Sequence, residues 1–366
     1  MEEILRLLLK YAQKENFKGY DPYDALNSPI LNRIAFNKYL RIFFTQLLKH
    51  FPFNIRKFLL IKKDYNPKGI GLFLSVYSKL KDVDNCYILK NLLLNLASKG
   101  YSGYCWGYNF PWQSRVFYLK PFTPTIVNTS FIAHAFLDAY EAFSNKQDLE
   151  ISTSTINFIL NDLNIHKEED FIVFSYTPID NLKVFNASLL GGSVISRISI
   201  IKNDNNLREI ALKCGLFAYK FQNADGSWFY APDIKYIDNF HTAYNLLSLK
   251  WIYKATQDKR ILISMEKGYE FYKKNLFTKD FLPKYYHNRI YPIDIHSYAT
   301  AIVLFCEFNE KDIAKKILEN ALNRMFDYKK HYFYFQDYKF FKIKIPYIRW
   351  SIAWMSYAIS KLFLDE

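Results

Sequence analysis

Six apolar segments with helical periodicity recur along the chain at nearly constant spacing. They begin at residues 66, 128, 186, 238, 294 and 348, so that successive starts lie 52 to 62 residues apart. Five of the six open with Asn or Asp, and these residues favour helix N-termini because the side-chain oxygen accepts a hydrogen bond from a free backbone N–H. Small and apolar residues cover most of the circumference of each segment, which predicts six buried helices.

Segments with one charged face alternate with the buried ones. In the segment 310–326, for example, Ile313, Ile317 and Leu322 share one face and charged residues occupy the other. We expect such helices at about residues 34–50, 84–99, 150–163, 205–222, 259–275 and 310–326.

Six buried helices that alternate with six amphipathic ones predict an all-α fold, the (α/α)6 toroid, in which an outer ring of helices shields an inner ring. No interior stretch is rich in Pro, Gly or Ser, so we expect a single domain over residues 1–366. Residues 1–20 read as an extra N-terminal helix that packs outside the ring.

Composition excludes several classes of protein. Half of the 366 residues are apolar and 23% are charged, which excludes global disorder. No uniformly apolar run reaches the ~18 residues of a membrane span, and acidic residues at positions 2 and 3 argue against a signal peptide. The four cysteines lie far apart without a CxxC pattern, so we expect no disulfide framework, no metal site and no cofactor in a cytoplasmic protein.

The net charge of +14 favours an anionic partner. The chain lacks a dense basic run and any motif of a known nucleic-acid-binding module, so nucleic acid is not the expected partner. Aromatic residues make up 19% of the chain, and Tyr and Trp cluster beside polar residues in a few loops. This composition is typical of surfaces that stack on sugars, and we expect an acidic oligosaccharide or polysaccharide as the partner.

The toroid also predicts where the site lies. Its inner helices all run in the same direction, so their N-termini and the preceding loops gather at one mouth of the barrel, where free N–H groups attract anionic or hydroxyl-rich ligands. We therefore expect one cleft lined by the loops 101–127, 172–185, 223–237, 281–293 and 328–347.

The loop YSGYCWGYNFPWQSR, residues 101–115, holds the densest aromatic cluster. One interpretation is that the loop stacks on sugar rings. Arg115 would then bind a carboxylate or phosphate of the ligand through its planar guanidinium group. The alternative is an aromatic plug that packs the barrel mouth. The candidate substrate-binding residues in it are Trp106, Tyr108, Asn109, Trp112, Gln113 and Arg115.

Two Asp/His pairs stand at equivalent ends of neighbouring buried helices, Asp238 with His241 and Asp294 with His296. An imidazole beside a carboxylate is a tunable general base near neutral pH, and we assign all four residues as catalytic candidates. The alternative is that each Asp caps its helix and each His is structural.

The segment PKYYHNRIYPID, residues 283–294, brings basic, phenolic and amide groups together. We assign Tyr286 to catalysis, and further substrate-binding candidates are Asn128, Asn186, His287, Arg289 and Arg349. Uronate lyases on α-toroids use this set of residue types: Asn or Arg neutralises the substrate carboxylate, and His or Tyr removes the acidified C5 proton. Uronyl C5-epimerases use similar chemistry, whereas a glycosidase requires two carboxylates.

Gln222, Gly226 and Trp228 resemble the QW motif of terpene cyclases and related α-barrel enzymes. In that motif the Gln and Trp tie the end of an outer helix to the next loop, which implies a structural role here. A terpene cyclase also needs an acidic DDxxD or DxDD motif, and the chain has neither, so cyclisation is a distant alternative.

The strings CWGYNFPWQSR, VNTSF, FNASLLGG, QNADGSW and IDNFHTAY resemble a family of proteins encoded with capsular, exopolysaccharide and O-antigen genes. The resemblance spans about residues 60–360 and implies an α-toroid in surface-glycan biosynthesis, without an established reaction. We therefore expect a carbohydrate-active enzyme that acts on an acidic glycan or lipid-linked oligosaccharide by lyase or C5-epimerase chemistry. A glycoside hydrolase and a non-catalytic glycan-binding or assembly protein stay open, as does peripheral contact with membrane-bound glycan machinery.

Overall fold

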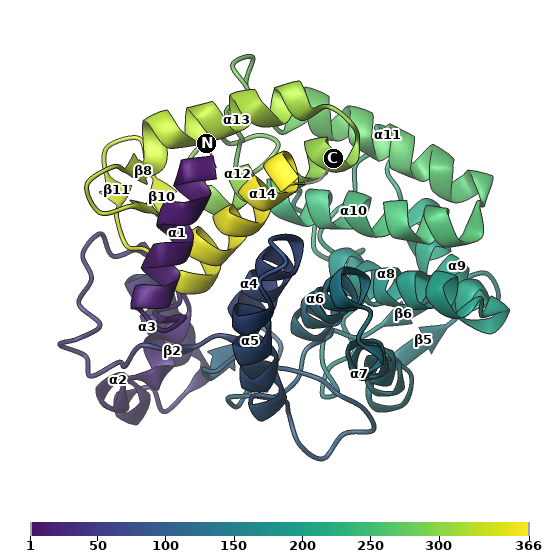
Figure 1. The fold of residues 1–366 in the computed structure, drawn as a ribbon, viewed down its shortest axis with the longest axis horizontal. Coiled ribbons are helices and arrows are strands. Elements are labelled where there is room, and N and C mark those ends of the chain that lie inside the picture. The colour runs from purple at the N-terminus through teal and green to yellow at the C-terminus, as the bar shows by residue number, and fades with distance from the viewer. Residues whose placement is uncertain (1, 365–366) are drawn as a thin grey trace.

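The computed structural model describes residues 2–364, which fold into two concentric rings of helices (Figure 1). Each inner helix packs on the next, and the last packs on the first, so that the inner ring is closed. The inner helices are α4 (Pro67–Lys79), α6 (Ile126–Phe143), α8 (Phe185–Lys202), α10 (Asn239–Thr256), α12 (Ile295–Glu307) and α14 (Trp354–Leu364).

Each inner helix is also covered by one outer helix, which completes the predicted (α/α)6 toroid. The side chains of the inner helices are buried over most of their circumference, as in α12, where every residue from Ile295 to Cys306 is buried. The outer helices are α5 (Val83–Asn95), α7 (Lys146–Asn157), α9 (Asn205–Lys220), α11 (Lys259–Asn275), α13 (Lys311–Met325) and, on α14, α1 (Glu2–Lys14).

One helix predicted for the outer ring lies elsewhere. The segment 34–50 does form a helix, α3 (Lys38–His50), but α3 packs on the 3-10 helix η1 (Asp24–Asn27), on α2 (Pro29–Ile34) and on strand β3. The expected extra helix α1 takes its place, because α1 has the apolar face (Leu5, Leu8, Leu9) that covers α14. Figure 1 shows α2 and α3 outside the double ring.

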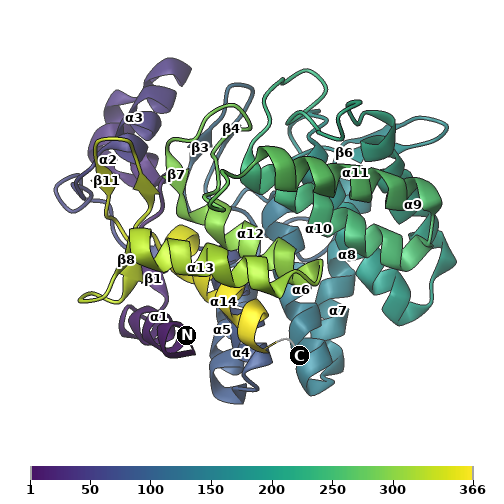
Figure 2. The same ribbon diagram turned by 90° about the horizontal axis from the view of Figure 1, so that it is seen from above.

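Short antiparallel strands connect the helices and leave the fold mostly helical. They pair as β1–β2, β3–β4, β5–β6 and β8–β9, and β10 lies between β7 and β11. Figure 2 shows β3, β4, β6 and β7 at one edge of the molecule, opposite the chain termini. The strands are β1 (Lys18–Gly19), β2 (Asp64–Tyr65), β3 (Trp112–Gln113), β4 (Tyr118–Leu119), β5 (Ile165–Lys167), β6 (Ile172–Phe174), β7 (Ile293–Asp294), β8 (Phe326–Asp327), β9 (Tyr332–Phe333), β10 (Gln336–Asp337) and β11 (Lys342–Ile343).

The starts of the inner helices agree with the predicted caps at three positions. Side chains of Asn66, Asp238 and Asp294 accept hydrogen bonds from backbone N–H groups in the first turn of α4, α10 and α12. Asn128 and Asn186 are not caps, because α6 begins after Thr125 and α8 begins without a side-chain cap. Both asparagines are therefore inside their helices and buried.

Two further helical turns are wider than an α-helix. A π-helical turn, η2 (Phe158–Asp162), extends α7, and another, η3 (Ile348–Ala353), precedes α14. Such turns occur frequently at functional sites.

The QW-like motif ties outer helix α9 to α11, in agreement with its predicted structural role. The Gln222 Nε2 donates to the carbonyls of Gly226 and Ser264, at 2.8 and 2.9 Å. The Trp228 ring is 1% exposed and its Nε1 donates to the Ala218 carbonyl at 2.9 Å. Gly226 has a φ of +89°, where glycine is favoured.

We predict that Trp228→Ala lowers the free energy of unfolding by about 3–5 kcal/mol, because it leaves a cavity and an unpaired carbonyl. The matched control is Tyr219→Ala on the exposed side of α9, with an expected change within about 0.5 kcal/mol. Urea denaturation of the three proteins measures both values, and equal stabilities would contradict the structural role.

Candidate active site

A cavity of about 210 Å³ lies at the N-terminal ends of the inner helices. The second residue of each of the first five inner helices lies in the cavity wall. In the last case the equivalent residue is the second one of η3, the turn that precedes α14. This volume is below the ~300–1,000 Å³ of pockets for drug-sized ligands and suits one sugar ring. The six equivalent residues are Lys68, Val127, Asn186, Phe240, His296 and Arg349.

Loop aromatics form the rest of the wall. Tyr108 stacks on Phe110 with ring centroids 5.1 Å apart, and Tyr230 stacks on Tyr236 at 5.0 Å. Flat rings with phenolic hydroxyls suit a ligand that has both C–H faces and hydroxyl edges. The aromatic loop residues in the wall are Tyr23, Tyr108, Phe110, Trp112, Tyr176, Tyr230 and Tyr236.

His241 is oriented by Asp238. The carboxylate of Asp238 accepts from the backbone N–H of His241 at 2.9 Å, and its second oxygen lies 2.6 Å from the imidazole Nδ1. An Nδ1–H donated to a carboxylate leaves Nε2 as the basic nitrogen, as in Asp–His pairs of hydrolases. The wall position of His241 therefore makes it a general-base candidate.

His296 belongs to a different arrangement from the one the sequence suggested. The Asp294 carboxylate does not bond its ring: it accepts from the His296 backbone N–H, from Gln336 Nε2 and from Trp350 Nε1, at 2.8, 2.5 and 2.7 Å. Burial raises the pKa of the Asp294 carboxyl, which these hydrogen bonds oppose. Asp294 thus caps α12 and holds Trp350 against the cavity.

The ring of His296 is linked instead to Tyr244 and Lys68. Its Nε2 lies 2.6 Å from the Tyr244 hydroxyl, and Lys68 Nζ donates to the same hydroxyl at 3.3 Å. Burial, and then the charge of Lys68, holds the pKa of His296 well below its usual range. Burial, and then the charge of Arg349, lowers the pKa of Lys68 well below its usual range. The three groups form a buried chain of proton donors and acceptors beside His241.

Arg349 lies in the cavity wall, and its positive charge is paired with the buried carboxylate of Asp21. Its Nε and Nη2 donate to the two carboxylate oxygens of Asp21, at 2.7 and 2.9 Å, and both side chains are buried. Asn66 Nδ2 lies 3.3 Å from Asp21 Oδ2 and 3.3 Å from Asn109 Oδ1. The pair joins the segment between β1 and η1 to η3, the turn that precedes α14, and the two residues are 328 positions apart in the sequence.

The structure brings six of the predicted site residues into the cavity wall and leaves the others elsewhere. Asp238 and Asp294 support the wall as described above. The residues in the wall are Tyr108, Trp112, Asn186, His241, His296 and Arg349.

Four residues that were predicted to bind substrate do not line the cavity and instead lie among other protein side chains. Trp106 is fully buried, and its Nε1 donates to the Leu93 carbonyl at 2.7 Å. Asn109 lies behind the Arg349–Asp21 pair, and Gln113 bonds Arg41 and the Phe117 carbonyl in the β3–β4 hairpin. Asn128 is buried within α6, and its amide atoms have no hydrogen-bond partner among residues 2–364.

The remaining predicted residues lie at or beyond the rim. Arg115 is exposed in the turn between β3 and β4, where its carbonyl accepts from Lys38. Tyr286 forms a tight turn with Arg289, and its ring lies 5.8 Å from that of Tyr236. His287 is half-buried in the same turn, and Arg289 is exposed. These four side chains do not line the cavity.

Three groups that shape the cavity were not predicted from the sequence: Asp21, Lys68 and Tyr244. A signal for Lys68 existed, because it follows Asn66 by two residues as His296 follows Asp294. Tyr244 lies one turn after His241. Asp21 had no such signal, since it precedes the repeats and meets Arg349 only through the fold.

Within residues 2–364, no group of three or more His, Cys, Asp or Glu side chains could hold a metal ion. All four cysteines are buried, and none of them forms a disulfide bond. In the same part of the chain, none of the helices has the length and apolar character that crossing a bilayer requires.

Comparison with known proteins identifies similar folds and no sequence family. No protein-family model matches the chain, and no curated sequence is significantly similar to it.

Solved structures of sugar enzymes do match. They include the cellobiose 2-epimerase from Bacillus thermoamylovorans B4167, with a TM-score of 0.63, 13% identity, and coverage of 82% of this chain and 89% of that one. The GH76 α-mannanase BT2949 from Bacteroides thetaiotaomicron gives a TM-score of 0.61, 14% identity, and coverage of 81% and 86%. A D-mannose isomerase gives a TM-score of 0.57, 11% identity, and coverage of 81% and 86%. At these identities the likeness shows the (α/α)6 toroid fold.

We predict that Asp21→Ala destabilises the protein by about 3–5 kcal/mol, because it leaves the buried Arg349 charge unpaired. The control is Glu15→Ala, which breaks the partly exposed ion pair with Lys63 and is expected to cost less than about 1 kcal/mol. Denaturant unfolding measures both. A loss at Asp21 no larger than at Glu15 would show that Arg349 is solvated.

We predict that the His296 ring stays neutral from pH 8 to pH 5, so that its Cε1 NMR resonance does not shift over this range. The unfolded chain binds a proton at this residue near pH ~6.5, and the folded protein does not. The stability that His296 contributes is therefore lost as the pH falls below about 6.5. The stability difference between wild type and His296→Gln should shrink from pH 8 to pH 5, and a titration midpoint near 6.5 would contradict the buried environment.

Proposed function

We propose that the protein is a sugar epimerase or isomerase that moves a proton at a carbon next to a carbonyl group. The single observation that carries this proposal is the composition of the cavity wall. Two imidazoles, His241 and His296, reach the wall, and among residues 2–364 no Asp or Glu side chain does. A glycoside hydrolase requires two carboxylates that flank the scissile bond, so hydrolysis is less well supported.

The arrangement supplies each group that such a reaction needs. His241, oriented by Asp238, removes the proton from the carbon beside the carbonyl of an open-chain sugar. The negative charge that develops on the carbonyl oxygen is stabilised by preorganised donors, for which the Tyr244 hydroxyl and the Arg349 guanidinium are the candidates in the wall. When the protonated His241 returns the proton to the neighbouring carbon, the product is an isomer. When the planar intermediate first rotates and presents its opposite face to His241, return of the proton to the same carbon gives an epimer.

His296 and Lys68 adjust the donor strength of Tyr244. Burial raises the pKa of the Tyr244 phenol well above its usual range, so the hydroxyl keeps its proton at neutral pH. The Tyr244 oxygen accepts a hydrogen bond from Lys68 Nζ and lies 2.6 Å from His296 Nε2. When neutral His296 carries its proton on Nε2 and donates to the same oxygen, the phenol proton remains for the substrate oxygen on which negative charge develops.

The solved structures that share the fold support this choice. Two of the three described above are named as a cellobiose 2-epimerase and a D-mannose isomerase. They support a reducing sugar as the substrate class.

A second candidate, lyase or C5-epimerase chemistry on a uronate, is favoured by Arg349. A guanidinium in the wall could meet a substrate carboxylate, although Asp21 already offsets its charge. The predicted setting, modification of an acidic or lipid-linked surface glycan in the cytoplasm, is part of this second proposal.

The test is incubation of the purified protein in D2O with aldoses, ketoses, reducing disaccharides and uronate-containing oligosaccharides. We expect deuterium at the carbon next to the carbonyl, detected by proton NMR, together with the epimer or isomer. His241→Asn and His296→Asn should each lower the exchange rate by about 10²–10⁴-fold.

His331→Asn is the matched control, because this exposed histidine lies in the β8–β9 turn and its positive φ tolerates Asn. Deuterium at C5 of a uronate, which indicates C5-epimerisation, or an unsaturated uronate product, which indicates elimination, would favour the second candidate. Release of a sugar by hydrolysis, or binding without turnover of any sugar, would contradict the proposal.

A further inference from the structure

Residues 25–63 form a basic, apolar segment outside the double ring. The segment contains eight Lys and Arg residues and no Asp or Glu, although acidic residues are frequent elsewhere in the chain. It packs on a small core of its own, made by Ala25, Leu31, Leu48 and Ile61. Its two flanking acids, Asp24 and Asp64, lie just outside it.

The outer surface of this segment is unusually apolar. Nine of the 24 large apolar side chains exposed within residues 2–364 belong to it, and Phe58 is 82% exposed. We call these nine side chains the apolar surface: Ile30, Ile34, Phe36, Tyr39, Phe43, Leu47, Phe53, Phe58 and Leu60.

On α3 the apolar surface forms a regular stripe. Tyr39, Phe43 and Leu47 are four residues apart and therefore share one face of the helix. Their exposed fractions are 79%, 55% and 51%, while Leu48 faces the small core. The solvent-facing side of the helix therefore carries an apolar stripe, and nothing in residues 2–364 covers it.

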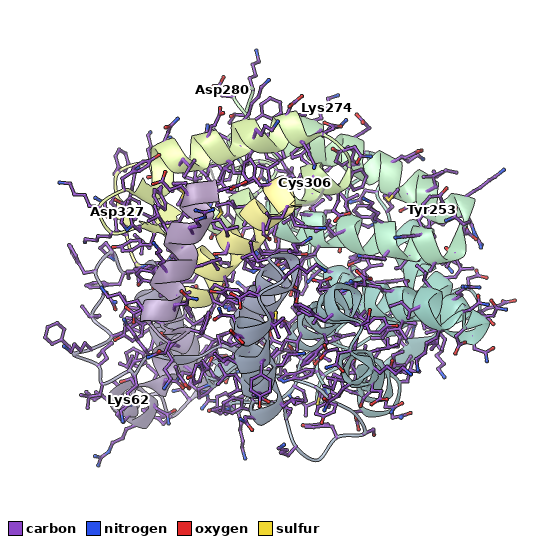
Figure 3. The ribbon with its side chains drawn as sticks, in the orientation of Figure 1. Lys62, Tyr253, Lys274, Asp280, Cys306 and Asp327 are labelled. Atoms are coloured by element: carbon purple, nitrogen blue, oxygen red, sulfur yellow. The ribbon has the colours of Figure 1, made fainter. Side chains whose placement is uncertain are left out.

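The positive charges stand beside these side chains. Arg33, Lys38, Lys57 and Lys62 are exposed, whereas Arg56 is buried against Asp24. Figure 3 shows Lys62 at the lower left margin of the molecule, in the corner that holds α2 in Figure 1.

The segment also adjoins the rim of the cavity. Lys49 of α3 lies over the ring of Tyr23, with Nζ 4.9 Å from its centroid, and Tyr23 lines the cavity. Arg41 Nε donates to Gln113 of β3 at 2.8 Å. Figure 2 shows α3 at the same edge of the molecule as β3, β4 and β7.

We propose that the apolar surface docks on an anionic lipid membrane and brings the cavity mouth to the level of the lipid headgroups. An amphipathic helix with Phe, Tyr and Leu on one face and cations beside it inserts at the boundary between headgroups and acyl chains. Exposed Lys and Arg add attraction to anionic lipids. Tyr39, Phe43 and Leu47 are neighbouring exposed apolar side chains on one helix face, and such groups mark contact surfaces.

Charge favours a membrane over a second copy of the chain. Two copies that met through this surface would bring two acid-free, positively charged segments together, and like charges in a contact are repulsive. An anionic bilayer offers the complementary charge and can accept side chains that protrude from the surface.

The test is sedimentation of the protein with phosphatidylcholine vesicles and with vesicles that contain about one quarter phosphatidylglycerol. We expect binding to the anionic vesicles, weakened by salt, and little binding to the neutral ones. Tyr39→Ser/Phe43→Ser keeps the net charge and should weaken binding at least tenfold.

The matched control is Val83→Ser/Tyr87→Ser, which removes two exposed apolar side chains with the same spacing from α5 of the outer ring. Circular dichroism and thermal melting should show that both variants remain folded. Binding is measured without substrate and so does not depend on the proposed reaction.

Three results would overturn the proposal: no binding of wild type to anionic vesicles at low salt, equal losses in the α3 and α5 variants, or a dimer in solution that Tyr39→Ser/Phe43→Ser dissociates. The third result would assign the surface to a second copy of the chain.

Discussion

Burial of the inner helices is the constraint on which this structure depends. Helices that are apolar around most of their circumference cannot face water on any side, and each of the six is shielded by two inner neighbours and one outer helix. The same arrangement gathers six helix N-termini around one cavity. Each N-terminus carries partial positive charge, so the geometry that buries the helices also makes the cavity electropositive.

The electropositive cavity explains the protonation of its side chains. Lys68 and Arg349 lie in the wall with His296, and their charges act together with burial to lower the pKa of the imidazole. Asp21 offsets the charge of Arg349 from behind the wall. A neutral imidazole that bonds a protonated phenol, next to a histidine oriented by a carboxylate, is suited to the transfer of protons rather than to the cleavage of a glycosidic bond.

The segment before the first inner helix connects these properties. It supplies Asp21 and Tyr23 to the site and carries the apolar surface on α3. Because it also holds the β3 hairpin through Arg41 and Gln113, movement of this segment would alter the cavity rim. The proposed membrane contact thus involves a part of the molecule that borders the cavity.

Local sequence patterns predict the double ring, the common direction of the inner helices and the end of the barrel where the cavity lies. These follow from periodicity, from small residues and from the helix caps at Asn66, Asp238 and Asp294, all of which are local properties. The sequence also selected His241 and His296, because their place in the first turn is fixed by the caps before them.

Which side chains meet depends on how the distant segments pack together. Asp294 bonds Trp350 rather than the His296 ring, and Asp21 reaches Arg349. Arg115 remains at the tip of a hairpin, outside the cavity, and α3 does not occupy the place in the outer ring that the alternation of buried and amphipathic segments predicted. Such contacts depend on competition among distant partners for the same buried space and hydrogen bonds, and a linear pattern of residues does not specify that competition.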